Sequence, residues 1–124
     1  MTGYQEVATD PSFEGQIVCF TAPMIGNYGV DDARLESPQP WVKAVLMRRC
    51  GGDEWANWLS SYGIVALEEI DTRKLVLRIR DAGSMRAAVV ADATELNSAA
   101  AVELVREQPP MEGQALVSAV SSVE

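Results

Sequence analysis

The chain has 124 residues, of which 48% are hydrophobic and 23% charged, and its formal net charge is −8. This length suits one domain, and the composition is typical of a globular protein with a sizeable core. The negative charge argues against binding nucleic acid or an anionic membrane surface, because both attract basic proteins. The apolar runs are also far shorter than the roughly 20 residues that span a bilayer.

Histidine is absent, and the two cysteines are Cys19 and Cys50. Without histidine, the chain cannot form Ser-His-Asp or Cys-His catalytic arrangements or histidine metal motifs. Carboxylate or lysine chemistry stays open, but no pair is marked out by its spacing. The cysteines form no C-x-x-C pair, so we expect two buried free thiols, with a disulfide or a reactive thiol as the alternative. We predict no catalytic residue, metal site or cofactor in this chain.

The first half of the chain predicts a helix, two strands and a long loop. A short helix is expected over residues 3–9, ending before Pro11 because a residue that precedes proline avoids the helical region. Residues 16–21 are rich in β-branched and aromatic side chains and predict a buried strand. The many glycine, asparagine and aspartate residues of segment 22–35 predict a loop. A second strand is expected over residues 42–48.

The middle of the chain predicts two helices on either side of a third strand. Asp53 is expected to cap a helix that ends near residue 63. The third strand is predicted at residues 64–70. Asp71 is the expected N-cap of a helix over residues 72–82, whose apolar side chains form one stripe.

The last part of the chain predicts a strand followed by helices. Residues 85–91 predict a fourth strand, because their continuous apolar run is typical of a sheet covered on both faces. Asp92 or Thr94 is expected to cap a helix over residues 93–107, and a short helical turn is expected at 114–119. Strands therefore alternate with helices from the second strand onward, which predicts an α/β domain.

Three local features suggest binding, and each also has a purely structural interpretation. The helix expected over residues 72–82 carries a basic cluster that is by default a solvated face and alternatively a docking surface for an acidic partner: Arg73, Lys74, Arg78 and Arg80. The loop at residues 26–29 lacks the phosphate-binding pattern, so a structural or interface loop is favoured. Ser12 lies in a tight Thr-Asp-Pro-Ser turn, where its hydroxyl most simply stabilises the turn.

Taken together, the ordered motifs of residues 1 to about 91 resemble the N-terminal domain of the small subunit of glutamine-dependent carbamoyl-phosphate synthetase. No single motif is decisive, but their order and spacing are specific. The motifs that carry the resemblance are Thr2-Gly-Tyr-Gln-Glu6, Thr9-Asp-Pro-Ser12, Gln16-Ile-Val18, Ile25-Gly-Asn-Tyr-Gly29, Glu36-Ser37, Ile70-Asp-Thr-Arg73 and Met85-Arg86.

The resemblance implies an α/β fold of the swivelling β/β/α three-layer type. It implies that residues 1–124 are this N-terminal domain, truncated at its N-terminus so that the family's N-terminal hairpin region is lacking, and without the glutaminase domain. A missing hairpin would expose a sheet edge, so a homo-oligomer is an expected consequence.

The resemblance also implies a function. In the family, the small subunit releases ammonia from glutamine, and the large subunit combines ammonia with bicarbonate and ATP into carbamoyl phosphate. This cytoplasmic reaction serves arginine and pyrimidine biosynthesis. The N-terminal domain is not catalytic by itself, and its partners are the large subunit and the glutaminase domain.

Two sets of site residues follow. Ser12 is the glutamine-binding candidate, because the family's serine at this position reaches the glutamine held by the neighbouring domain. The interface candidates are Ile25, Gly26, Asn27, Tyr28 and Gly29. Two other hypotheses stay open: a stand-alone, self-associating interaction module of the same fold, and an independent enzyme.

Overall fold

A parallel sheet forms the centre of the fold in the computed structural model, which describes residues 2–92, 94 and 97–121. Within these ranges its strands are β1 (Ile17–Cys19), β2 (Ala44–Leu46) and β3 (Val65–Leu67), with β2 in the middle. The strands are in register, with Ala44 opposite both Ile17 and Val65. All carboxyl ends of the strands therefore lie at the same edge of the sheet.

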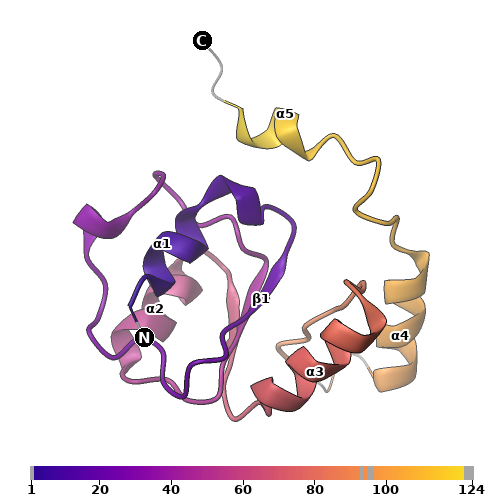
Figure 1. The fold of residues 1–124 in the computed structure, drawn as a ribbon, viewed down its shortest axis with the longest axis horizontal. Coiled ribbons are helices and arrows are strands. Elements are labelled where there is room, and N and C mark those ends of the chain that lie inside the picture. Colours follow the sequence, from indigo (N-terminus) through magenta and orange to yellow (C-terminus); the bar gives the residue numbers. More distant parts are fainter. Residues whose placement is uncertain (1, 93, 95–96, 122–124) are drawn as a thin grey trace.

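Helices flank the sheet and continue beyond it. Figure 1 shows α1 and α2 beside the sheet, whereas α3, α4 and α5 follow one another away from it. The described part of the chain contains α1 (Tyr4–Thr9), α2 (Asp53–Ser61), α3 (Thr72–Ala82), α4 (Ser98–Glu107), α5 (Leu116–Val120) and the 3-10 turns η1 (Pro11–Phe13) and η2 (Asp32–Arg34).

The core lies between α1, α2 and the sheet, and Trp55 of α2 is one of its largest members. This side chain is completely buried, with its ring centre 4.8 Å from that of Tyr4 and 5.3 Å from that of Trp58. The buried hydrophobic cluster consists of Tyr4, Ala8, Phe20, Ile25, Val42, Val45, Met47, Trp55 and Leu59. Aromatic side chains bury large apolar areas, so this cluster is the main source of stability for the small domain.

Most of the predicted elements are confirmed. The α/β class, α1, the first three strands, α2 and α3 occur where the sequence predicts them, although the strands are shorter. Asp71 caps α3 by accepting a hydrogen bond of 3.0 Å from the backbone N–H of Lys74. Asp53 is instead the first residue of α2, and its predicted role as the cap is wrong because Gly52 holds that position. Its charge still suits the positive end of the helix.

The predicted fourth strand at residues 85–91 is wrong. None of these residues pairs with β1 or β3, and the side chains of residues 85–88 are exposed. Arg86 instead donates hydrogen bonds to the carbonyl oxygens of Arg106 and Gln108, at the end of α4. An apolar run does not by itself select a partner strand, and this segment leaves the outer edges of β1 and β3 unpaired.

The last predicted helix begins later than expected. Asn97 caps α4 by accepting from the backbone N–H of Ala100 at 2.9 Å, so neither Asp92 nor Thr94 is its cap. Asp92 accepts from the backbone N–H and the hydroxyl of Thr94, a local turn that competes with a helix. The predicted residues 93, 95 and 96 lie outside the described residues. The predicted turn at 114–119 is confirmed by α5.

Both cysteines are free and half-buried. The prediction of free thiols rather than a disulfide is therefore confirmed. Burial raises the pKa of the Cys19 thiol, which keeps it protonated and unreactive at neutral pH. Among the described residues, no helix combines the length and the apolar character that crossing a membrane requires.

Candidate functional site

Ser12 lies in the η1 turn, between the end of α1 and the start of β1. Pro11 fixes the first residue of this turn, and the carboxylate of Asp10 accepts a hydrogen bond of 2.8 Å from the backbone N–H of Ser12. Gln16 donates from its side chain to the carbonyl oxygen of Ser12 at 3.0 Å. The Ser12 residue is exposed, so a rigid local turn presents it at the surface.

The hydroxyl of Ser12 interacts with Asp10. Hydrogen bonds from the backbone N–H of Ser12, and secondly from its side chain, lower the pKa of the Asp10 carboxyl. The turn is held mainly by the Asp10 carboxylate, whereas the residue types predict the Ser12 hydroxyl as its stabilising group. The hydroxyl is also accessible to a partner, because a serine hydroxyl can both donate and accept.

The five interface candidates divide into buried and accessible positions. Ile25 is completely buried, and its backbone pairs with the segment after β2. Its N–H donates to the carbonyl oxygen of Arg49 at 3.0 Å, and its carbonyl oxygen accepts from the N–H of Gly51 at 2.7 Å. Gly26 is also buried, Tyr28 and Gly29 are half-buried, and Asn27 is exposed. The accessible surface of this loop therefore consists of residues 27–29.

Gly26 lies directly against α2. Its φ of +83° belongs to the left-handed region, and a Cβ atom placed there would be 2.7 Å from the Cβ atom of Trp55. Both the backbone conformation and the close approach therefore require glycine. The contact fixes the base of the loop on a completely buried residue of the core.

Tyr4 of α1 fixes the tip of the same loop. Its hydroxyl donates to the carbonyl oxygen of Gly29 at 2.6 Å, and its ring stacks on that of Tyr28 with the centres 4.5 Å apart. Tyr28 in turn accepts from the backbone N–H of Gly3 at 2.8 Å. Burial raises the pKa of Tyr4, so its hydroxyl remains a protonated donor.

Two more side chains of α1 bind the continuation of the loop. The side-chain oxygen of Gln5 accepts a hydrogen bond of 2.9 Å from the backbone N–H of Asp31. The hydroxyl of Thr9 accepts one of 2.9 Å from the backbone N–H of Glu36. Gln5 and Thr9 are completely buried. No pattern in the sequence predicts these roles; the only signal is the set of polar or amphipathic residues on one short helix, of which those at positions 4, 5 and 9 bind the loop.

Ser12 and the accessible loop residues 27–29 lie at opposite edges of the sheet. Ser12 precedes the amino end of β1, whereas the loop follows its carboxyl end (Figure 1). The structure therefore does not bring the predicted glutamine-binding and interface residues together. Among the described residues, no group of three metal-ligating side chains of the His, Cys, Asp or Glu type lies close enough to hold a metal ion.

Comparison with known proteins decides the family. Residues 1–89 match the family model of the carbamoyl-phosphate synthase small chain, CPSase domain. The chain belongs to this small-chain family. The carbamoyl phosphate synthase small chain of Akkermansia muciniphila is 42% identical over 130 aligned residues, which cover 98% of this chain and 34% of the relative.

Other relatives carry the same name. The carbamoyl phosphate synthase small chain of Nitratidesulfovibrio vulgaris strain Hildenborough is 41% identical, over 98% of this chain and 34% of the relative. That of Halobacterium salinarum is 48% identical over 90 residues, which are 73% of this chain and 25% of the relative. The predicted resemblance is thus confirmed, and the chain spans about a third of the length of the carbamoyl phosphate synthase small chains of Akkermansia and Nitratidesulfovibrio.

A pair of glycine substitutions tests how the loop is fixed. Gly63 also has a positive φ, of +71°, but a Cβ atom there would meet nothing within 4 Å. We expect Gly63→Ala to lower the free energy of unfolding by about 1 kcal/mol, from backbone strain alone. Gly26→Ala adds the clash with Trp55 and should cost about 3 kcal/mol in total. Urea denaturation measures both, and equal losses would contradict the close contact.

The pKa of Asp10 tests the geometry of the Ser12 turn. We expect this carboxyl to titrate below its ordinary value of 3.8, so its capping contribution is present above that pH and is lost as the pH falls through the lowered pKa. Ser12→Ala removes the hydroxyl bond but keeps the backbone N–H bond, so the pKa of Asp10 should rise only part of the way back.

Side-chain carboxyl chemical shifts, followed by NMR through a pH titration, measure this pKa. Asp92 is the internal control, because Thr94 lowers its pKa through the same kinds of hydrogen bond. A Ser12→Ala chain in which the pKa of Asp10 is unchanged, or in which the pKa of Asp92 shifts by the same amount, would count against the turn as described.

Proposed function

We propose that this chain acts as the non-catalytic CPSase domain of a carbamoyl-phosphate synthase small chain and supports glutamine-dependent synthesis of carbamoyl phosphate in the cytoplasm, for arginine and pyrimidine biosynthesis. The main support is the family match over residues 1–89, together with relatives that carry the small-chain name. The proposal includes the swivelling three-layer architecture and a glutaminase domain and a large subunit as partners.

Within this proposal, Ser12 completes the glutamine site of the neighbouring glutaminase domain. Its position on an exposed turn supports the role, because Pro11 and the Asp10 cap hold it in one conformation before the partner arrives. A preformed contact loses little conformational entropy on binding. The hydroxyl would exchange its contact with Asp10 for the polar groups of glutamine.

The loop residues 27–29 contribute the docking surface in the same proposal. Tyr4 and Gly26 fix the loop from both ends, so it too is rigid before docking. Because Ser12 and this loop lie at opposite edges of the sheet, we infer that they serve different contacts. One faces the glutaminase domain, and the other faces the large subunit.

A second candidate, the self-associating interaction module, has one observation in its favour. In the described part of the sheet, the outer edges of β1 and β3 have no neighbouring strand. Unpaired edges can add strands from another copy. Light scattering over a concentration series distinguishes the two: a mass that doubles with concentration favours the module, and a constant monomer mass removes its support.

Reconstitution tests the docking proposal. We expect the chain to associate with a carbamoyl-phosphate synthase large subunit when the glutaminase domain is also supplied, and to release no ammonia from glutamine alone. Size-exclusion chromatography and an ammonia assay measure the two outcomes. No association in the presence of both partners would refute the proposal, and glutamine hydrolysis by the isolated chain would show an independent enzyme.

Ser12→Ala in the reconstituted assembly tests the glutamine contact. Loss of one hydrogen bond to the charged end of glutamine should raise the KM for glutamine about tenfold. We expect kcat to change little, because the serine takes no part in bond cleavage. Ser60→Ala, an exposed serine on α2, is the matched control and should leave KM unchanged. Equal KM values for the two variants would contradict the role of Ser12.

A further inference from the structure

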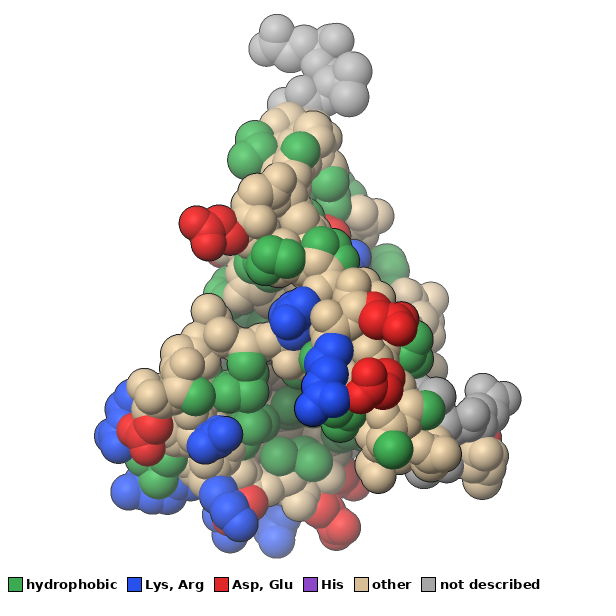
Figure 2. All heavy atoms as spheres, turned by 90° about the vertical axis from the view of Figure 1, so that its right-hand side faces the viewer, with side chains coloured by type: hydrophobic (Ala, Val, Ile, Leu, Met, Phe, Trp, Pro, Cys, Tyr) green, Lys and Arg blue, Asp and Glu red, His purple; other side chains and the backbone are tan. Residues whose placement is uncertain are grey.

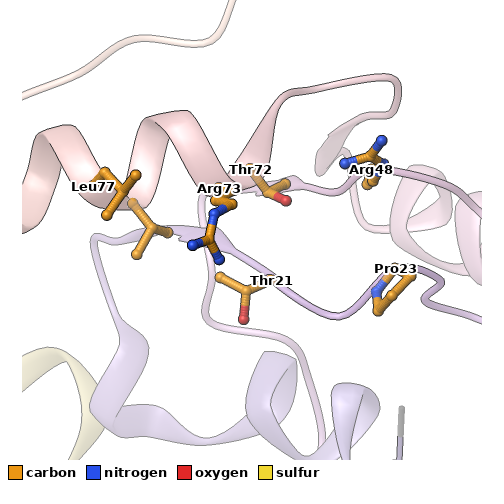
Figure 3. A pocket seen from close by; sticks show the side chains of 7 residues that line it. Thr21, Pro23, Arg48, Thr72, Arg73 and Leu77 are labelled. Atoms are coloured by element: carbon orange, nitrogen blue, oxygen red, sulfur yellow. The ribbon is translucent and has the colours of Figure 1, made fainter.

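A hollow lies at the carboxyl edge of the sheet, separate from Ser12 and from the loop residues 27–29. Thr21 follows β1, Arg48 follows β2, and Thr72 and Arg73 begin α3, so all the strands direct the chain to this place. The hollow has a volume of about 330 Å³. Figure 3 shows these side chains around it. The carboxyl ends of parallel strands are where α/β proteins commonly bind ligands.

Two guanidinium groups provide positive charge at the hollow. The ion pairs found in the described part of the chain involve neither Arg48 nor Arg73. Both residues are exposed, and in Figure 3 the guanidinium of Arg73 reaches toward Thr21. Figure 2 shows Lys and Arg side chains at the lower left and bottom of the space-filling view, with acidic side chains among them.

The start of α3 adds to this positive potential. The helix has eleven residues, so its N-terminus carries the usual partial positive charge. The cap residue Asp71 is the opposing negative group, and it is engaged with the backbone N–H of Lys74. Within the described residues, the backbone N–H of Arg73 has no acceptor and can serve an incoming anion.

Thr72 supplies an independent indication of a ligand. Its side chain lines the hollow although the residue is only 2% exposed. The hydrogen bonds formed in the described part of the chain do not include its hydroxyl, which faces into the hollow in Figure 3. Water reaches the hydroxyl oxygen from the hollow, so this hydroxyl can donate to a ligand that replaces that water.

We propose that this hollow binds a small oxyanion, of the phosphate or carboxylate class. Arg48 and Arg73 pair with its charge, and the Thr72 hydroxyl and the N–H of Arg73 donate to its oxygens. Guanidinium groups match such oxyanions in geometry. The apolar wall of Val76 and Leu77 shields the bound anion from water on one side and strengthens these bonds. The site is independent of the proposed synthase function.

Titration of the full chain with inorganic phosphate tests the proposal, with chloride added to hold the ionic strength constant. We expect saturable changes in the backbone amide signals of residues 48, 72 and 73, measured by two-dimensional NMR. Acetate in a second titration represents the carboxylate class and, with its single charge, should bind more weakly than phosphate. The absence of saturation with both anions would overturn the proposal.

Matched arginine variants locate the site. Arg73→Gln should weaken phosphate binding about tenfold, because it removes a charge-assisted hydrogen bond. Arg78→Gln removes the same charge from the same helix outside the hollow. The phosphate affinity of this variant should therefore stay within about twofold of that of the unchanged chain. Equal weakening by both variants would show a diffuse charge effect and would refute the site.

Thr72→Val provides a second test that preserves shape and charge. We expect it to weaken phosphate binding several-fold while the amide spectrum elsewhere remains that of the native fold. If Arg73→Gln fails to fold, Arg48→Gln takes its place against the same control. Native affinity in both Thr72→Val and the arginine variant would overturn the proposal.

Discussion

The structure depends on buried polar side chains of α1 that serve as hydrogen-bond partners for a segment without regular structure. Residues 28–37 form only the short η2 turn, yet their backbone groups must be paired wherever they are buried. Gln5 and Thr9, both completely buried, accept from this segment. A helix of six residues is too short to be stable alone, so α1 and the loop stabilise each other.

This arrangement gives the family motifs a physical meaning. Most of the first motif is structural, because Tyr4 and Gln5 face the loop, and Thr9 of the second motif does the same. Ser12 of the second motif is instead exposed, on a turn that Pro11 begins. In the non-catalytic role that we propose, the domain holds two rigid surfaces at opposite edges of one sheet, each available to a different neighbour in the synthase.

Local patterns predicted most of the fold but little of the site. The cap at Asp71 and the strands around β2 depend on neighbouring residues, so the sequence predicts them. The strand predicted at residues 85–91 does not form, because an apolar run does not specify its partner strand. The contact of Gly26 with Trp55, and the hollow that Arg48 and Arg73 both line, join distant parts of the chain. No periodicity could indicate them, although the residue types were visible.

Hydrogen exchange at the backbone amides of Asp31 and Glu36 tests the central claim most directly. Both residues lie in the loop and are exposed, so an ordinary loop would exchange at nearly the rate of an unstructured peptide. Our account predicts strong protection at both amides, because Gln5 and Thr9 accept from them inside the fold. Unprotected exchange at both amides in the folded chain would contradict it.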